Sequence, residues 1–256
     1  MDIVRTLDDW SKRRSKISEG TLGFVPSLGG LHGGHAMLLR RSVEENDSTV
    51  LSIFLNRTQF NEVQDLQNYP SVEAADLAVA EQCGVDVVFL PSHEDIYPDN
   101  YTFRVVSEHP LSKVMEGVFR PGHFEGVLTV VLKLLLIVKA TRAYFGEKDY
   151  QQLVLVREMA KAFFLETEIV PCPTVRDERG LPLSSRHNRL TQEELRIGQE
   201  FAEVLQTHQF VADIERELVK KAIAFDYVEE KENRLFAAAR IGGVRLIDNV
   251  PATWGK

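Results

Sequence analysis

Segments rich in β-branched and aromatic residues alternate along this chain with longer segments whose apolar residues recur every three or four positions. The longer segments predict helices with one apolar face. Strands and helices that alternate in this way are typical of βαβ units, so we expect an α/β fold with a doubly wound parallel sheet. The predicted strands are 21–25, 49–55, 85–90, 142–145 and 168–170, and the predicted helices are 35–44, 72–83, 124–138 and 150–164.

The character of the sequence changes near residue 173. A charged loop is followed by a polar helix from about Gln192 and by two β-rich segments, 225–229 and 235–250. Within the second segment, Gly242-Gly243 separates two runs by the two residues of a tight hairpin turn. We therefore predict a Rossmann-like domain over 1–174 and a small C-terminal α+β domain over 175–256.

The charge balance limits the ligands that the chain can bind. The formal net charge of −8, from 38 acidic and 30 basic residues, gives no basic surface for nucleic acid or an anionic membrane. The longest apolar run, 127–138, contains Lys133 and is well short of the roughly 20 residues that span a bilayer, so we expect a buried helix. Cys83 and Cys172 form no disulfide framework and the N-terminus has no apolar leader, so we expect a cytoplasmic protein.

The stretch SLGGLHGGH (27–35) leads from a predicted strand through a glycine-rich turn into a predicted helix. Ligands of open α/β sheets bind at such turns, and free N–H groups at a helix N-terminus favour an anion such as phosphate. His32 and His35 are three residues apart, so both can donate to a phosphoryl oxygen from one side of the first turn. Alternatively, both are packing or solvent-facing histidines. A metal site is disfavoured because no cysteine or acidic cluster lies nearby.

Two further stretches carry polar residues beside predicted elements. In SIFLNRTQF (52–60), Asn56 and Gln59 can orient hydroxyl groups or a carboxylate without adding charge, although alone they would be turn residues. In EGVFRPGHFEGV (116–127), Arg120, His123 and Glu125 lie in a proline–glycine turn before the buried helix, where we favour a structural role.

AYFGEKDYQQL (143–153) is a second junction between a strand and a helix. Gly146 leaves space there, and Lys148 offers a point charge for phosphate. Asp149 and Gln152 are expected to face the same crevice. A purely structural junction is an equal alternative.

LPLSSRHNRL (181–190) places two hydroxyl groups and two arginines at the expected domain junction. A solvated charged loop is the simpler alternative. Together with Lys148, the cation Arg186 and the donors Ser184 and Ser185 would form a clamp opposite the histidine pair. Such a clamp fits a nucleotide triphosphate and the charge that develops at its α-phosphate.

Two motifs together resemble a known superfamily. His32-Gly-Gly-His35 is similar to the HIGH motif, and Leu183-Ser-Ser-Arg186 stands where the KMSKS-type loop belongs in the nucleotidyltransferases. The stretches quoted above, with YPSVEAADLAVAEQCGVDVVFLPSHEDIYP and PTVRDERGLPLSSRHNRL, resemble in order the pantothenate synthetase (pantoate–β-alanine ligase) family. LFAAARIGGVRLIDN extends the resemblance to the C-terminal part.

The resemblance implies an AMP-forming ligase that joins pantoate to β-alanine. ATP and pantoate would give pantoyl adenylate and pyrophosphate, and β-alanine would attack the adenylate to give pantothenate and AMP. The resemblance also implies Mg²⁺, a homodimer and a C-terminal lid. With the acidic charge, we expect no nucleic-acid or membrane partner.

The resemblance also implies roles for residues where the motifs match. His35 would be the main catalytic histidine, and Gln59, Gln152 and Asn56 would bind pantoate or β-alanine. The other residues implied in catalysis are His32, Lys148, Ser184, Ser185 and Arg186. The residues implied in ATP binding are Leu28, Gly29, Gly30, Leu31, His32, Gly33, Gly34, His35, Gly146, Glu147, Lys148, Asp149, Val175, Leu183, Ser184, Ser185 and Arg186.

A few positions depart from the family pattern. Ser27-Leu28-Gly29-Gly30 replaces a run such as Thr-Met-Gly-Ala, Leu183 replaces a methionine, and Arg57 stands where proline is common. The rival hypotheses are an adenylyltransferase acting on a phosphate ester, an aminoacyl-tRNA synthetase core and a nucleotide-binding sensor. The first would need further cations, the second an anticodon-binding region, and the third neither Lys148 nor both histidines.

Overall fold

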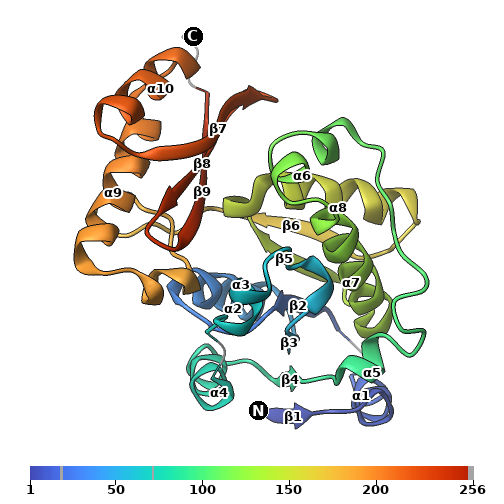
Figure 1. Cartoon of the computed structure of the whole chain (residues 1–256). Coiled ribbons are helices and arrows are strands. Elements are labelled where there is room, and N and C mark those ends of the chain that lie inside the picture. Colours follow the sequence, from blue (N-terminus) through green and yellow to red (C-terminus); the bar gives the residue numbers. More distant parts are fainter. Residues whose placement is uncertain (18–19, 71, 253–256) are drawn as a thin grey trace. The chain divides into compact units, whose positions relative to one another are not determined.

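The computed structural model describes residues 1–17, 20–70 and 72–252, and the chain divides into two compact units (Figure 1). The first unit consists of Met1–Glu147 and Gln151–Cys172, and the second of Lys148–Tyr150 and Pro173–Lys256. The short segment Lys148–Tyr150 therefore packs with the C-terminal residues, although it lies within the N-terminal part of the sequence.

The first unit is built on a parallel sheet, as the alternation of strands and helices predicts. Its strands are β1 (Asp2–Val4), β2 (Leu22–Ser27), β3 (Ser48–Ile53), β4 (Val87–Phe89), β5 (Arg142–Gly146) and β6 (Glu168–Cys172). Within the described residues the strand order is β1-β4-β3-β2-β5-β6, and the pairings are parallel. From β2 the chain moves outward to β3 and β4, and then crosses to β5 and β6 on the other side. The predicted doubly wound sheet is confirmed, and its winding reverses between β2 and β5.

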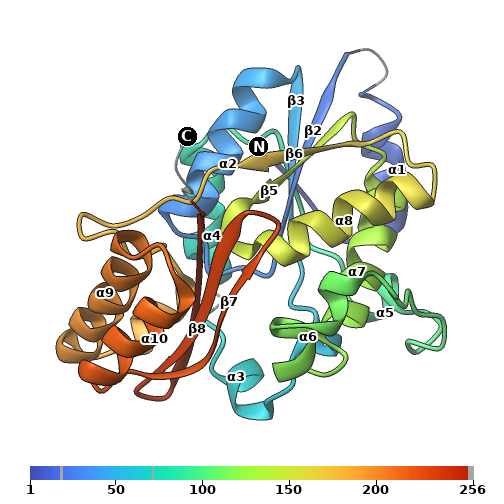
Figure 2. The ribbon, with the colours of Figure 1, turned by 90° about the horizontal axis from the view of Figure 1, so that it is seen from above.

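Helices cover both faces of this sheet. The longer ones are α1 (Leu7–Arg14), α2 (Gly33–Glu45), α4 (Glu73–Gln82), α7 (His123–Val138) and α8 (Tyr150–Ala162). Figure 2 shows α2 and α4 on one side of the strands and α1, α7 and α8 on the other. Shorter connecting elements are α3 (Val63–Gln67), α5 (His93–Ile96), α6 (Glu116–Phe119), and the 3-10 turns η1 (Arg57–Gln59), η2 (Pro110–Lys113) and η3 (Glu147–Asp149).

The central strands are buried because helices cover both of their faces. Phe24, Val50 and Val88 are fully buried, and burial of each such side chain contributes about 1.5–3 kcal/mol. The apolar run 127–138 forms most of α7, and most of its side chains are buried, so the prediction of a buried helix is confirmed. In the described part of the chain, no helix is long and apolar enough to cross a membrane.

The second unit packs helices against an antiparallel sheet, which in the described residues has the order β7-β8-β9. Its elements are the 3-10 turn η4 (Ser185–Arg189), α9 (Gln192–Thr207), α10 (Val211–Lys220), β7 (Ala224–Lys231), β8 (Arg234–Ile241) and β9 (Val244–Pro251). The predicted hairpin turn at Gly242-Gly243 is confirmed, and Gly242 adopts the left-handed conformation (φ 56°). Phe201 and Leu205 pack with Leu218 in a core that belongs to this unit alone.

Candidate active site

Several backbone N–H groups of the loop after β2 donate to side chains of β2 and α4. Gly29 and Gly30 adopt left-handed conformations (φ 92° and 65°), which glycine tolerates. The N–H of Gly29 donates to Ser27 Oγ (3.0 Å). The N–H groups of Gly30 and Leu31 donate to the carboxylate of Asp76 in α4 (2.9 and 2.7 Å). Because Asp76 is only 2% exposed, it holds the loop from inside the unit.

The two histidines at the start of α2 accept backbone N–H groups of the same turn. Nδ1 of His32 accepts from Gly34 (3.1 Å), and Nδ1 of His35 accepts from the N–H of His32 (3.3 Å). The two ring centroids are 4.2 Å apart. Because each Nδ1 is an acceptor, a neutral ring carries its proton on Nε2. The turn therefore differs from the expected cradle of free amides, and Nε2 is the atom through which each histidine can donate to a phosphate.

The polar residues after β3 form a network around Asn56. Asn56 is fully buried, and its amide nitrogen donates to Gln59 Oε1 (2.8 Å). Its side-chain oxygen accepts from the hydroxyl groups of Tyr97 (2.8 Å) and Thr58 (2.9 Å). Burial raises the pKa of Tyr97 to about 12, so its phenol stays protonated and remains a donor. Since Asn56 engages the oxygen of Gln59, the amide nitrogen of Gln59 is the group that can donate to a ligand.

The backbone of Gln59 is held by the turn before α7. Its carbonyl oxygen accepts from His123 Nδ1 (3.0 Å) and from Arg120 Nη2 (3.3 Å). Gly126 approaches so closely that a Cβ there would lie 2.8 Å from the Cα of Gln59. These contacts give Arg120 and His123 the structural role expected of them, and Glu125 forms a partly exposed ion pair.

The two neighbouring glutamines of α8 differ in their surroundings. Gln151 is buried, and its amide nitrogen donates to the carbonyl oxygens of Leu111 (2.8 Å) and Val114 (3.1 Å). Gln152 is half-buried. Gln151 therefore anchors the helix, whereas Gln152 is the glutamine that can face a ligand.

Most of the predicted residues of the first unit follow the carboxyl ends of neighbouring strands. The strands β2, β3 and β5 lie side by side, because β2 pairs with both of the others. His32 and His35 follow β2, Asn56 and Gln59 follow β3, and Glu147 follows β5. Ligands of open parallel sheets bind at this edge, next to the point where the winding reverses. The structure thus brings these residues to the edge where a nucleotide is expected.

The remaining candidates belong to the second unit. The N–H of Leu183 donates to the carbonyl oxygen of Val175 (2.9 Å), which closes the loop between them. Ser184 precedes η4, and its Oγ accepts the N–H of Arg186 (3.3 Å). Ser185 is buried and Arg186 is half-buried. Local hydrogen bonds therefore fix the backbone that carries Arg186.

In the second unit, Lys148 acts on the nearby turn η4 through its charge. Burial and the nearby Lys148 ammonium lower the pKa of His187 from its usual 6.5, while Asp177 opposes the shift. The Lys148 Nζ atom is 4.0 Å from the carboxylate of Asp149, which is a long and partly exposed ion pair.

A buried ion pair holds the loop that precedes η4. Arg176 donates to both carboxylate oxygens of Asp248 (2.7 and 2.8 Å) and to the carbonyl oxygen of Gly180 (2.8 Å). Asp248 is 2% exposed, and burial raises the pKa of its carboxyl, while the Arg176 guanidinium opposes this. Because removing one partner of a buried pair costs about 3–5 kcal/mol, the conformation of the loop depends on both.

Sequence reasoning did not single out Asp76, Tyr97 or Asp248. Asp76 contacts the β2 loop from 45 positions away, and Tyr97 contacts Asn56 from 41 positions away. Neither residue has a local motif that predicts its partner. For Asp248, the only indication is a charged residue in the middle of an apolar strand, where an unpaired carboxylate would be costly.

Comparison with known proteins gives long matches. The family model described as Pantoate-beta-alanine ligase matches residues 2–251. Pantothenate synthetase of Coxiella burnetii (strain RSA 331 / Henzerling II) is 49% identical over 249 residues, which cover 97% of this chain and 96% of that protein. Pantothenate synthetase of Legionella pneumophila (strain Corby) is 49% identical over 250 residues, which cover 97% of this chain and 99% of that protein.

A solved structure is similar over the full length. The crystal structure of pantoate-beta-alanine ligase from Francisella tularensis, complexed with beta-gamma ATP and beta-alanine, is 40% identical. Its TM-score is 0.95, and the match covers 100% of this chain and 99% of that chain. Pantothenate synthetase from Thermus thermophilus is 36% identical, with a TM-score of 0.91 and coverage of 98% and 99%. The chain therefore belongs to the pantoate-beta-alanine ligase family.

Proposed function

We propose that this chain joins pantoate to β-alanine with ATP, through a pantoyl adenylate. Family membership supports the overall reaction, and the Francisella relative was crystallised with a nucleotide and β-alanine. The observation that carries the proposal is the gathering of polar residues after β2, β3 and β5 on one edge of the sheet. A nucleotide and a small acid can meet at such an edge.

In this proposal, the histidines and the cations act on the phosphates of ATP. His32 and His35 donate through Nε2 to phosphoryl oxygens, while Lys148 and Arg186 stabilise charge on the α-phosphate and the departing pyrophosphate. The full set proposed to bind ATP is Leu28–His35, Gly146–Asp149, Val175 and Leu183–Arg186.

Pantoate is proposed to bind beside the end of β3. Gln59 donates its amide nitrogen to an oxygen of pantoate, and Gln152 binds pantoate from α8. Asn56 supports this pocket by holding Gln59 Oε1. The side chains proposed here are neutral amides. They can orient the ionised carboxylate of pantoate without an ion pair that would weaken it as a nucleophile.

The chemistry needs positioning more than proton transfer. In the first step, a carboxylate oxygen of pantoate bonds to the α-phosphorus, the bond to the bridging oxygen breaks, and pyrophosphate leaves. In the second step, the neutral amine of β-alanine attacks the acyl carbon, AMP leaves, and the amine proton passes to solvent. Because the first nucleophile is already ionised, orientation and charge stabilisation carry this step, and no serine nucleophile is required.

Magnesium is proposed to accompany ATP. Among the described residues, no group of three or more His, Cys, Asp or Glu side chains is placed to hold a metal. Mg²⁺ is commonly bound by one or two carboxylates together with substrate phosphates. This donor set fits an ion bound mainly by the triphosphate, with Asp149 beside Lys148 as the carboxylate at hand.

The remaining parts of the proposal concern the whole protein. We propose that residues 1–174 bind the nucleotide and pantoate and that residues 175–256 act as a lid. We also propose a homodimer that works in the cytoplasm without nucleic-acid or membrane partners. Sedimentation of the purified protein tests the dimer.

Pyrophosphate release tests the order of the reaction. With ATP, Mg²⁺ and pantoate, we expect about one pyrophosphate per active site before β-alanine is added, because the adenylate forms first. Addition of β-alanine should then start steady release. If pyrophosphate appears only when β-alanine is present, the adenylate pathway is wrong.

A further inference from the structure

The segment that carries Lys148 is held by the C-terminal sheet. Lys148–Tyr150 packs with the second unit, although it connects β5 to α8 and Tyr150 is the first residue of α8. The ring of Tyr150 lies 6.0 Å from that of Phe236 in β8, and the guanidinium of Arg234 lies 4.2 Å above the Tyr150 ring. Two neighbouring side chains of the sheet therefore fix the end of this segment.

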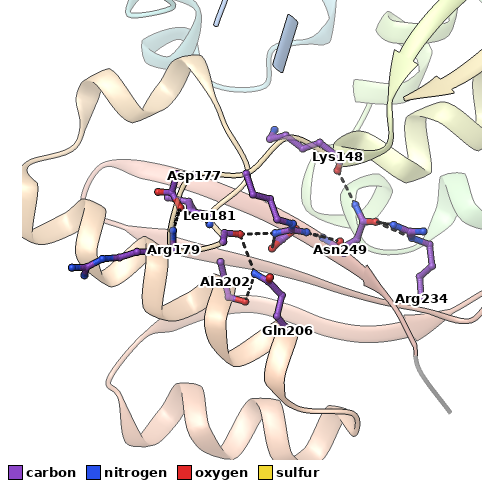
Figure 3. Close-up of polar contacts among 11 residues, drawn as sticks. Lys148, Asp177, Arg179, Leu181, Ala202, Gln206, Arg234 and Asn249 are labelled. Atoms are coloured by element: carbon purple, nitrogen blue, oxygen red, sulfur yellow. Dashed lines mark hydrogen bonds and ion pairs between the residues drawn. The ribbon is translucent and has the colours of Figure 1, made fainter. Parts of the chain in front are cut away.

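The next contact reaches the backbone of Lys148 itself. The amide nitrogen of Asn249 in β9 donates to the carbonyl oxygen of Lys148 (2.9 Å), as Figure 3 shows. The side-chain oxygen of Asn249 accepts from Nε and Nη2 of Arg234 (2.8 and 2.6 Å). Arg234 has only donors and a carbonyl is only an acceptor, so a single orientation of the amide satisfies both partners. Since Asn249 is 3% exposed, this arrangement is shielded from water.

The residue before Asn249 holds the second cationic segment. Asp248 binds Arg176 through both of its carboxylate oxygens, and Arg176 lies in the loop that leads to Ser184 and Arg186. Arg176 also donates to the carbonyl oxygen of Asn249 (3.2 Å). Two consecutive residues of β9 are thus bonded to the two segments that carry Lys148 and Arg186.

We propose that Asn249 is a positioning residue that sets where the Lys148 ammonium lies relative to Arg186. Its hydrogen bond holds the peptide plane that follows Lys148, and that plane sets where the Lys148 side chain leaves the backbone. Asp248 holds the other segment from the same strand, so one strand positions both backbone segments from which the two cations extend. This inference rests on the proposed contact of Lys148 with ATP phosphates.

The change Asn249→Asp removes the hydrogen bond to the carbonyl oxygen of Lys148 and keeps the size of the side chain. One carboxylate oxygen keeps the partner Arg234, whereas the other faces the carbonyl oxygen of Lys148 and cannot donate. We expect the rate of pyrophosphate release to fall about 10- to 100-fold, as misplacement of a reacting group by about 1 Å does. The KM for pantoate should stay within about twofold, because the proposed pantoate residues lie in the first unit. Asn233→Asp, in the exposed turn between β7 and β8, is the matched control and should leave the rate unchanged.

A double-mutant cycle separates positioning from general damage. In a Lys148→Met background the ammonium is absent but the carbonyl remains, so Asn249→Asp should cause little further loss. An equal loss in both backgrounds, or no loss in the wild-type background, would overturn the proposal. If the aspartate variant does not fold, Asn249→Ala is measured in the same cycle without a new charge. If Lys148→Met alone retains full activity, the proposed contact of Lys148 with ATP is wrong. This result is distinct from a failure of the proposal about Asn249, which would show as an equal loss in both backgrounds.

Discussion

The histidine pair lies in a loop whose backbone N–H groups have acceptors inside the protein. The N–H groups of residues 29–32 and of Gly34 already have acceptors inside the protein. In a phosphate-binding loop of the P-loop kind, such groups would bind the ligand themselves. Here Asp76 accepts two of the backbone N–H groups, and in the proposed mechanism the imidazole rings are the donors to phosphate instead.

Replacing His35 with alanine should lower the rate of pyrophosphate release about 10²–10³-fold, which is typical of losing one donor to developing charge. The fold should lose only about 0.5–2 kcal/mol, because one capping contact of α2 disappears. The rate and the free energy of unfolding are measured on the same preparation. His208→Ala, at the end of α9, is the control. A His35→Ala rate near that of wild type would remove His35 from the mechanism.

Several elements could be predicted from sequence, and the exceptions have physical causes. The predicted strand 49–55 is observed as β3 (Ser48–Ile53), because a buried parallel strand is a continuous apolar run. α10 was not predicted, although Val211, Ile214 and Leu218 follow the three- and four-residue spacing of a helix with one apolar face. β1 has three residues and no periodicity to detect. For the site, the motifs single out the residues that we propose to contact the substrates, whereas Asp76 and Tyr97 act through contacts that only the fold creates.

The close packing of α7 against η1 predicts an effect of a single methyl group. In Gly126→Ala, the new Cβ would lie 2.6 Å from the carbonyl oxygen of Thr58. Since backbone must move, we expect a loss of about 1–3 kcal/mol in the free energy of unfolding and a higher KM for pantoate, because Gln59 shifts. The control Gly243→Ala has no atom within 4 Å of its Cβ and should change neither quantity. An unchanged KM for pantoate in a destabilised Gly126→Ala protein would show that the position of η1 does not affect pantoate binding.

The turn η4 predicts a dependence of stability on pH. The pKa of His187 is lowered in the folded chain by burial and by Lys148. The unfolded chain therefore binds a proton near pH 6.5 that the folded chain does not yet bind, so stability falls as the pH drops below that value. In His187→Gln this contribution is absent, and the free energy of unfolding should decline less between about pH 7.5 and 5.5. Urea titrations at several pH values measure the difference, and parallel curves for the two proteins would contradict the assignment.

At the scale of the whole molecule, the chain consists of two units that each have a hydrophobic core. The residues proposed to bind ATP come from both. The histidines belong to the first unit, and Lys148 and Arg186 to the second. We therefore expect ATP binding to slow amide hydrogen exchange in both units.

Hydrogen exchange with α,β-methylene ATP, which the enzyme cannot cleave between the α- and β-phosphates, tests this expectation. Amide exchange should slow in 28–35 and also in 183–189. The turn 231–234 should exchange at the same rate with and without the nucleotide. Protection confined to the first unit would refute the proposed lid role of residues 175–256.

The strand order of the first unit also affects how the protein is made. β1 precedes the other described strands in the chain, but among the described residues it pairs with β4 alone, where Asp2 is opposite Val87. At a typical 5–20 residues per second, the ribosome needs about 4–17 s to make the intervening chain. During that time the first residues have no strand to pair with, while β2 and β3 already have each other. β1 is therefore added to the edge of the sheet after the centre of the sheet can form, and in a nascent chain stalled before residue 87 it has no β4 to pair with.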